Sequence, residues 1–187
     1  MVLVFGGSFN PPTLAHEAII KKLYITYKPK KIIIVPTGDF FNWKDNLVPY
    51  KDRYHMASLM VKDLDYAVLS DIEDTKEFLG SYHTLNQLKQ SYDNLYFVVG
   101  ADHIKSLDQW IDYKKLIRDY QFIIMTRNDY TLDEPYLKKL GVRYEVFNFS
   151  SPISSTKVRQ NLKKHLDFLN PLVKDYILKH NLYQEVK

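Results

Sequence analysis

Six short apolar runs rich in β-branched and aromatic residues constrain the fold of this 187-residue chain more than any other feature. They cover residues 2–5, 31–36, 66–69, 95–100, 121–125 and 143–147. Runs of this length and composition predict strands that are buried on both faces. Apolar residues at helical spacing lie between several of them, from residue 14, over 51–62 and over 83–90. The alternation predicts one α/β domain with an open, mainly parallel sheet and helices on both faces.

The loops that follow the strands are where such a sheet binds ligands, because its clefts form beyond the carboxyl ends of the strands. Residues 6–16, 37–44 and 100–110 occupy such positions, and residues 150–159 follow the last predicted strand. We therefore expect the functional residues in these four segments.

The first loop, FGGSFNPPTLAH at residues 5–16, leads from a strand directly into a helix. Gly6 and Gly7 let a ligand approach the main chain closely, because they carry no Cβ. Thr13 is placed to cap the helix, and His16 stands where a capping box has Glu or Gln. An imidazole at a helix start adds a donor to a site that favours anions, which predicts phosphate binding. The loop alone is equally compatible with an ordinary helix start that binds nothing.

Residues 154–159 form a second helix start of the same kind. One of Ser154, Ser155 and Thr156 is expected to cap the helix. Its first turn carries Lys157 and Arg159 and no acidic residue. Cations are unfavourable at a helix N-terminus unless an anion is bound there. Two such starts in one domain favour a polyphosphate ligand.

The composition fits a small anionic ligand. The formal net charge of +4 is spread among many acidic residues, so it does not indicate nucleic acid. The chain has no cysteine, which excludes disulfides and thiolate sites and favours a reducing cytoplasm. No apolar stretch approaches the roughly 20 residues that cross a bilayer, and the first run is too short for a signal peptide. We expect no membrane and no nucleic-acid partner, and the sequence leaves a homo-oligomer open.

Several common site types are disfavoured. The sequence contains neither GxxxxGK[ST] nor a GxGxxG after its first strand. Its histidines lack zinc-like spacing, so we expect no protein metal site. No hydroxyl stands in a recognisable nucleophile arrangement, and we expect no covalent intermediate. Phosphoryl-type transfer can proceed by positioning and electrostatic stabilisation alone.

The two helix starts also carry a family resemblance. Residues 6–16 resemble the GGxF(D/N)Px(H/T)xxH signature of the nucleotidyltransferase superfamily, which has a Rossmann-like fold. Residues 153–159, ISSTKVR, match its second signature, ISSTxxR. VVGAD at 98–102, Trp110, and the ending VKDYI at 173–177 with Leu182 and Tyr183 resemble nicotinate (nicotinamide) mononucleotide adenylyltransferases, of the bacterial nicotinate-nucleotide type. The likeness covers essentially the whole chain.

The resemblance implies that the AMP moiety of ATP is joined to nicotinate mononucleotide, giving deamido-NAD and pyrophosphate with help from Mg²⁺. His16 and Thr13 would be catalytic, and the part from about 150 to 187 would complete the ATP site. The implied ATP-binding residues are Gly6, Gly7, Ser8, Phe9, His16, Gly100, Asp102, Ser154, Ser155, Thr156 and Arg159. The implied mononucleotide-binding residues are Asn10, Lys44, Ser81 and Trp110, with Trp110 stacked on the pyridine ring.

The sequence departs from the family pattern at residues 80–85, GSYHTL, where bacterial members have SYTxxTL. In those members a threonine helps to recognise the nicotinate carboxylate. Ser81 takes its place when the alignment runs back from Thr84 and Leu85. The alternatives are nicotinamide mononucleotide as the preferred substrate, a phosphopantetheine adenylyltransferase, a cytidylyltransferase, and a nucleotide-binding regulatory module without catalysis.

Overall fold

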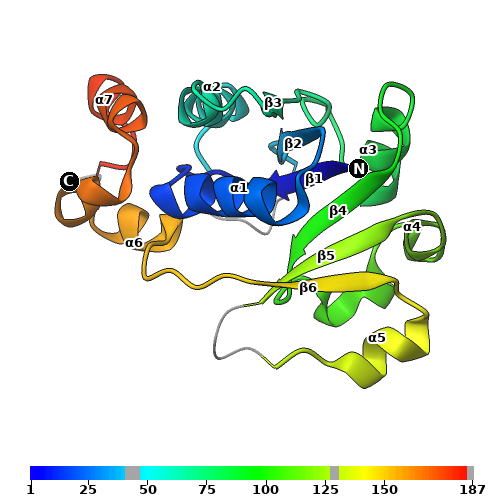
Figure 1. The fold of residues 1–187 in the computed structure, drawn as a ribbon. Coiled ribbons are helices and arrows are strands. Elements are labelled where there is room, and N and C mark those ends of the chain that lie inside the picture. The colour runs from blue at the N-terminus through cyan, green and yellow to red at the C-terminus, as the bar shows by residue number, and fades with distance from the viewer. Residues whose placement is uncertain (41–46, 127–130, 185–187) are drawn as a thin grey trace.

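The computed structural model of the protein describes residues 1–40, 47–126 and 131–184. In this part of the chain a six-stranded sheet runs through the molecule in the order β3-β2-β1-β4-β5-β6, and every neighbouring pair is parallel (Figure 1). The strands are β1 Val2–Gly7, β2 Lys31–Pro36, β3 Ala67–Leu69, β4 Leu95–Gly100, β5 Gln121–Thr126 and β6 Tyr144–Asn148. The predicted strands and the parallel α/β fold are confirmed.

Both faces of the central strands are buried, which explains why these strands are continuous apolar runs in the sequence. The edge strand β6 is largely exposed. In β1 the side chains of Leu3 and Phe5 belong to one hydrophobic cluster, whereas Val2 and Val4 belong to the other. Successive side chains of a strand point to opposite faces, so a strand between two cores needs an apolar residue at every position.

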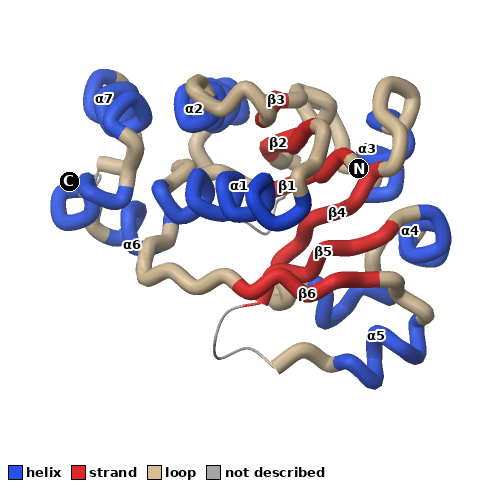
Figure 2. The backbone as a smooth tube through the Cα atoms, viewed as in Figure 1, coloured by secondary structure: helices blue, strands red, loops and turns tan. Residues whose placement is uncertain are grey.

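Helices cover the two faces separately (Figure 2). The first cluster is packed by α1 Leu14–Tyr27, α2 Tyr50–Val61, α6 Ser155–Gln160 and α7 Pro171–Lys179. The second is packed by α3 Ser81–Leu88, α4 Tyr113–Asp119 and α5 Glu134–Leu140, and by the 3-10 helix η1 Ile104–Gln109. A second 3-10 helix, η2 Lys163–Phe168, joins α6 to α7.

The strand order reverses between β1 and β4. From β1 the chain continues outward to β2 and β3, and from β4 it continues in the other direction to β5 and β6. The connections that leave β1 and β4 therefore diverge, and a crevice opens at their carboxyl ends. In Figure 1 the start of α1, α6 and the C-terminal segment lie together on that side of the molecule.

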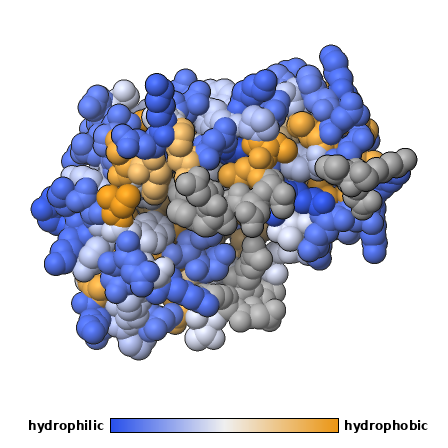
Figure 3. Space-filling model, turned by 180° about the vertical axis from the view of Figure 1, so that it is seen from behind, coloured by the Kyte–Doolittle hydropathy of each residue, from blue (hydrophilic) through white to orange (hydrophobic). Residues whose placement is uncertain are grey.

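The surface is largely hydrophilic. Seen from behind, hydrophobic residues gather near the middle of the face and charged or polar residues cover most of the rest (Figure 3). Among the described residues, no helix combines the length and the apolarity needed to span a membrane.

Candidate active site

A cleft of about 590 Å³ opens at this crevice. Its walls come from the connections after β1, β4 and β6, from the end of β5 and from α6. The two helix starts that the sequence singles out, more than 130 residues apart, thus face one space. The lining includes these residues predicted to bind or act on a ligand: Ser8, Asn10, Thr13, His16, Gly100, Asp102, Ser154, Ser155, Thr156 and Arg159.

His16 is held by the cap of its own helix. Thr13 is the N-cap of α1. Its backbone N–H donates to Nδ1 of His16 over 3.1 Å, and its Oγ1 lies 3.0 Å from the same nitrogen. Because Nδ1 accepts the backbone N–H, the imidazole proton is carried by Nε2. His16 thus fills the capping-box position with an acceptor and keeps a donor on its other nitrogen, while the Thr13 hydroxyl holds the ring.

Phe9, predicted among the ATP-binding residues, has its side chain in the core, with 1% of the residue's surface exposed. Its ring packs against Phe5 and His16, with centroids 5.7 and 5.2 Å away. A Cβ on Gly7 would stand 3.3 Å from the same ring. The absence of a side chain at Gly7 thus leaves room for the Phe9 ring, which packs against the imidazole of His16. Gly6 and Gly7 are the last residues of β1 and do not line the cleft.

The start of α6 is bound to the loop after β1. Ser154 caps the helix by accepting the backbone N–H three residues further on. The Ser155 hydroxyl donates to the carbonyl of Pro11 over 2.7 Å, and the Arg159 guanidinium donates to the carbonyl of Asn10 over 2.7 Å. Two of the predicted phosphate-binding residues therefore also fix the main chain of the first loop.

Asn10 is the point where distant segments meet. It is 2% exposed, and its Oδ1 accepts hydrogen bonds from the Tyr183 hydroxyl over 2.7 Å and from the backbone N–H of Val48 over 3.3 Å. The sequence predicts Asn10 as a mononucleotide-binding residue, and it does line the cleft. The structure adds that its side chain and its main chain are both held by other parts of the fold.

Gly100 and Asp102 form the β4 side of the cleft. A Cβ built on Gly100 would come within 2.5 Å of Oδ1 of Asp102, so the carboxylate lies against the bare Cα. The Asp102 side chain is 68% exposed. Glycine at position 100 therefore allows a solvent-facing carboxylate to turn back over the strand end, where an adenosine ribose is expected.

Two further mononucleotide candidates, Ser81 and Trp110, do not line the cleft. Ser81 begins α3, and Trp110 follows η1 and packs against Phe97 of β4, with ring centroids 6.4 Å apart. Their segments touch, because a Cβ on Gly80 would stand 2.9 Å from Cβ of Ile111. Lys44 lies outside the described residues.

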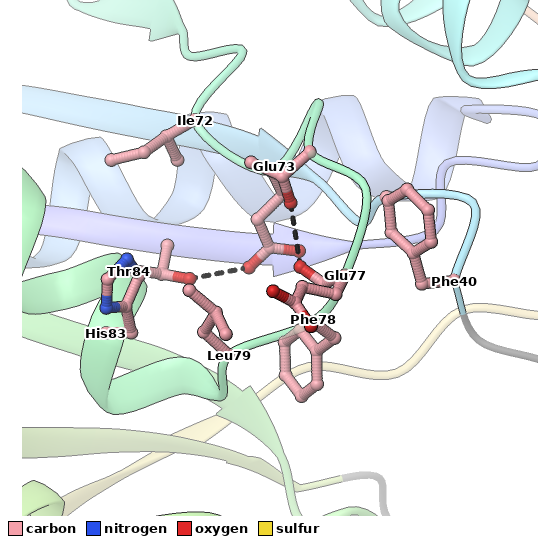
Figure 4. A pocket seen from close by; sticks show the side chains of 10 residues that line it. Phe40, Ile72, Glu73, Glu77, Phe78, Leu79, His83 and Thr84 are labelled. Carbon is pink, nitrogen blue, oxygen red and sulfur yellow. Dashed lines mark hydrogen bonds between the residues drawn. The ribbon is translucent and has the colours of Figure 1, made fainter.

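A small pocket lies beside the start of α3. There Thr84 donates to the carboxylate of Glu73 over 3.0 Å (Figure 4). Its volume of about 30 Å³ has room for roughly two water molecules and not for a pyridine ring. We therefore do not place a substrate in this pocket.

Arg53 of α2 is a structural residue that the sequence does not single out. Its side chain is fully buried and donates to the carbonyl of Ser8 at 2.9 Å, the carbonyl of Val48 at 3.0 Å and the carboxylate of Asp39 at 2.7 Å. One guanidinium thus joins the loop after β1 to the chain after β2 and to the start of α2. Arginine residues in helices are mostly exposed, so the sequence gives no reason to expect Arg53 to be buried.

The cleft also contains residues that sequence motifs do not mark, among them Met125 and Thr126 at the end of β5, and Phe149 after β6. Their position at or just after the carboxyl ends of strands is the available signal. The described part of the chain brings together no three His, Cys, Asp or Glu side chains that could hold a metal ion.

Comparison with known proteins agrees with this geometry. Residues 4–161 match the model of the cytidylyltransferase-like family. The chain is 62% identical over 187 residues, the full length of both chains, to the probable nicotinate-nucleotide adenylyltransferase of Acholeplasma laidlawii. It is 33% identical over 165 residues to that of Aliarcobacter butzleri, covering 86% of this chain and 87% of the relative. The chain belongs to the nicotinate-nucleotide adenylyltransferase family.

Solved structures support the same membership. Nicotinic acid mononucleotide adenylyltransferase of Plasmodium falciparum, complexed with NaAD, superposes with a TM-score of 0.81 at 28% identity. The match covers 97% of this chain and 96% of that one. The same Plasmodium enzyme complexed with APC gives a TM-score of 0.77. The recognition of an adenylyltransferase of NAD biosynthesis is confirmed at the level of the family.

Proposed function

We propose that this protein joins the AMP moiety of ATP to nicotinate mononucleotide, forming deamido-NAD and releasing pyrophosphate. The observation that carries the proposal is the convergence of His16 with Ser154, Ser155 and Arg159 on one cleft at the reversal of strand order. Phosphate oxygens from a triphosphate would find donors there from several directions. The substrates follow from the relatives, whose names describe nicotinate-nucleotide adenylyltransferases.

The chemistry needs no nucleophile from the protein. The phosphate oxygen of the mononucleotide attacks the α-phosphorus of ATP in line, and the bond from that phosphorus to the β-phosphate bridge breaks. His16, with its proton on Nε2, donates a hydrogen bond to phosphate oxygens on which charge develops. Because Thr13 fixes the imidazole, this donor is oriented before the substrate arrives.

We expect the reaction to require Mg²⁺, which binds to ATP. Mg²⁺ keeps several waters and is commonly held by substrate phosphates together with one or two carboxylates. We propose that Mg²⁺ is brought as the ATP complex, bound to the phosphates of the substrate. The segment from about residue 150 onward then completes the ATP site of a single nucleotidyltransferase domain. A cytoplasmic location stays a prediction.

The test is a substrate panel with Mg-ATP, in which pyrophosphate release is measured with nicotinate mononucleotide, nicotinamide mononucleotide and phosphopantetheine. We expect the highest kcat/KM with nicotinate mononucleotide. A higher kcat/KM with nicotinamide mononucleotide would show that the enzyme prefers the amide form of the substrate. Turnover with phosphopantetheine alone would show that the protein is a phosphopantetheine adenylyltransferase. Absence of turnover with every acceptor would refute an adenylyltransferase activity.

A further inference from the structure

The C-terminal segment turns back onto the cleft after α7. Helix α7 ends at Lys179, and the backbones of Asn181 and Tyr183 then adopt left-handed conformations with φ of 52° and 57°. Asparagine tolerates this region, but a tyrosine there is uncommon and persists only where its surroundings hold it. The N–H of Leu182 donates to the carbonyl of Ile177 over 3.0 Å and fixes the turn. The turn directs Tyr183 into the protein.

Tyr183 is partly buried against the first hydrophobic cluster, and its hydroxyl donates to Oδ1 of Asn10 over 2.7 Å. Burial raises the pKa of the Tyr183 phenol above its ordinary value, so the hydroxyl keeps its proton. The phenol is therefore a constant donor. This contact joins the C-terminal segment to the loop after β1, across 173 positions of sequence.

The contact determines how the Asn10 amide is oriented. A carbonyl oxygen of an amide has two lone pairs, and Oδ1 of Asn10 receives two donors, from Tyr183 and from Val48. A reversed amide would place an N–H against both donors. The Asn10 main chain is held separately by Arg159. Loss of the Tyr183 hydroxyl thus loosens the side chain and leaves the main-chain anchor in place.

We propose that Tyr183 is a positioning residue for the transfer reaction, whose hydroxyl fixes the Asn10 amide in the orientation that receives the mononucleotide. The inference rests on the proposed function, because it assigns the Asn10 amide to the acceptor substrate. Tyr183 lies outside both sequence signatures, and it contacts the loop after β1 through the side chain of Asn10. Tyr183 acts through Asn10 and does not itself line the cleft.

The test compares Tyr183→Phe with Tyr176→Phe as a matched control. Tyr176 lies in the same C-terminal part and also donates one hydrogen bond to the body of the protein, to Asp52 over 2.8 Å, but it does not reach the loop after β1. Steady-state kinetics with nicotinate mononucleotide and Mg-ATP, and thermal unfolding, are measured for the full chain. We expect Tyr183→Phe to lower kcat/KM for the mononucleotide by about three- to tenfold, the range of one hydrogen bond. The KM for ATP should stay within about twofold.

The control separates positioning from stability. Tyr176→Phe should lower the Tm by a similar amount and leave both KM values unchanged. Equal kinetic losses in the two variants, or wild-type kinetics in Tyr183→Phe, would overturn the inference while the proposed function stands. A wild-type protein that turns over no mononucleotide would overturn both.

A double-mutant cycle tests the route through Asn10. In an Asn10→Ala background, the change from Tyr183 to Phe should have no further effect on kcat/KM for the mononucleotide, because its target is already absent. A full additional loss in that background would show that Tyr183 acts by another route.

Discussion

At the scale of single residues, His16 performs two tasks with its two ring nitrogens. Nδ1 closes the cap of α1 through the Thr13 N–H, and Nε2 keeps the proton that a phosphate can receive as a hydrogen bond. A capping box uses only the first of these tasks, for which Glu or Gln suffices. Substitutions can therefore separate helix capping from catalysis.

We expect His16→Gln to retain the Tm of the wild type, because glutamine accepts the N-cap N–H, and to lower kcat by about 10²- to 10³-fold, because the rigid donor is lost. His16→Ala should lower kcat as much and also cost about 1 kcal/mol of unfolding free energy. Affinity for ATP should change little in either variant. Turnover and urea unfolding measure the two effects, and wild-type turnover in both variants would remove His16 from the mechanism.

Gly100 gives a second prediction at this scale. In Gly100→Ala the new methyl group would overlap Oδ1 of Asp102, which is exposed and free to rotate away. We expect the protein to fold with an unchanged Tm and the KM for ATP to rise by about tenfold, as for one lost charge-assisted hydrogen bond. Asp102→Asn serves as the control that removes charge without movement. An unchanged KM for ATP in Gly100→Ala would show that the position of Asp102 does not matter.

At the scale of elements, Arg53 binds the ends of two strands and the start of a helix into one unit. We expect Arg53→Met to cost about 2–4 kcal/mol of unfolding free energy, because buried carbonyls of Ser8 and Val48 lose their donor. Asp39→Asn should cost less, since an amide oxygen still accepts. The double variant should be no less stable than Arg53→Met alone. Denaturant unfolding measures all three, and additive losses would contradict a shared interaction.

The same elements show what a sequence can and cannot predict. The central strands are predictable, because a strand between two cores must be apolar at nearly every position, as in Leu95–Gly100. The edge strand Tyr144–Asn148, in which Val146 is exposed, is predictable from its β-branched and aromatic residues. The short helices α4, α5 and α7 are not predicted, because a helix of seven to nine residues shows too few turns for a clear period. The two helix starts that form the site are predictable from their hydroxyl-bearing and basic side chains, such as Thr13, Ser154 and Arg159. The burial of Phe9 and the contacts of Arg53 and Tyr183 are not, since they depend on partners far along the chain.

At the scale of the whole molecule, buried tyrosines make stability depend on alkaline pH. Burial raises the pKa of Tyr120 to about 12, with a smaller contribution from Tyr82. Between pH 10 and 12 the folded chain therefore holds the phenolic proton that the unfolded chain releases, so its stability is complete below pH 10 and falls above it. We expect the Tm of Tyr120→Phe to fall by roughly 5–10 °C less than that of the wild type across this interval. Thermal unfolding of both proteins at pH 10 and at pH 12 measures the difference.

The contact between Asn10 and Tyr183 also orders events in time during synthesis. Asn10 of the loop after β1 is synthesised 173 positions before Tyr183. Domains fold as their segments emerge, at roughly 5–20 residues per second. The sheet can therefore assemble well before the amide of Asn10 receives its second donor. A nascent chain arrested before Tyr183 would present the loop after β1 with only the Val48 N–H as donor to Oδ1 of Asn10, so the orientation of this amide is completed only once Tyr183 has been added.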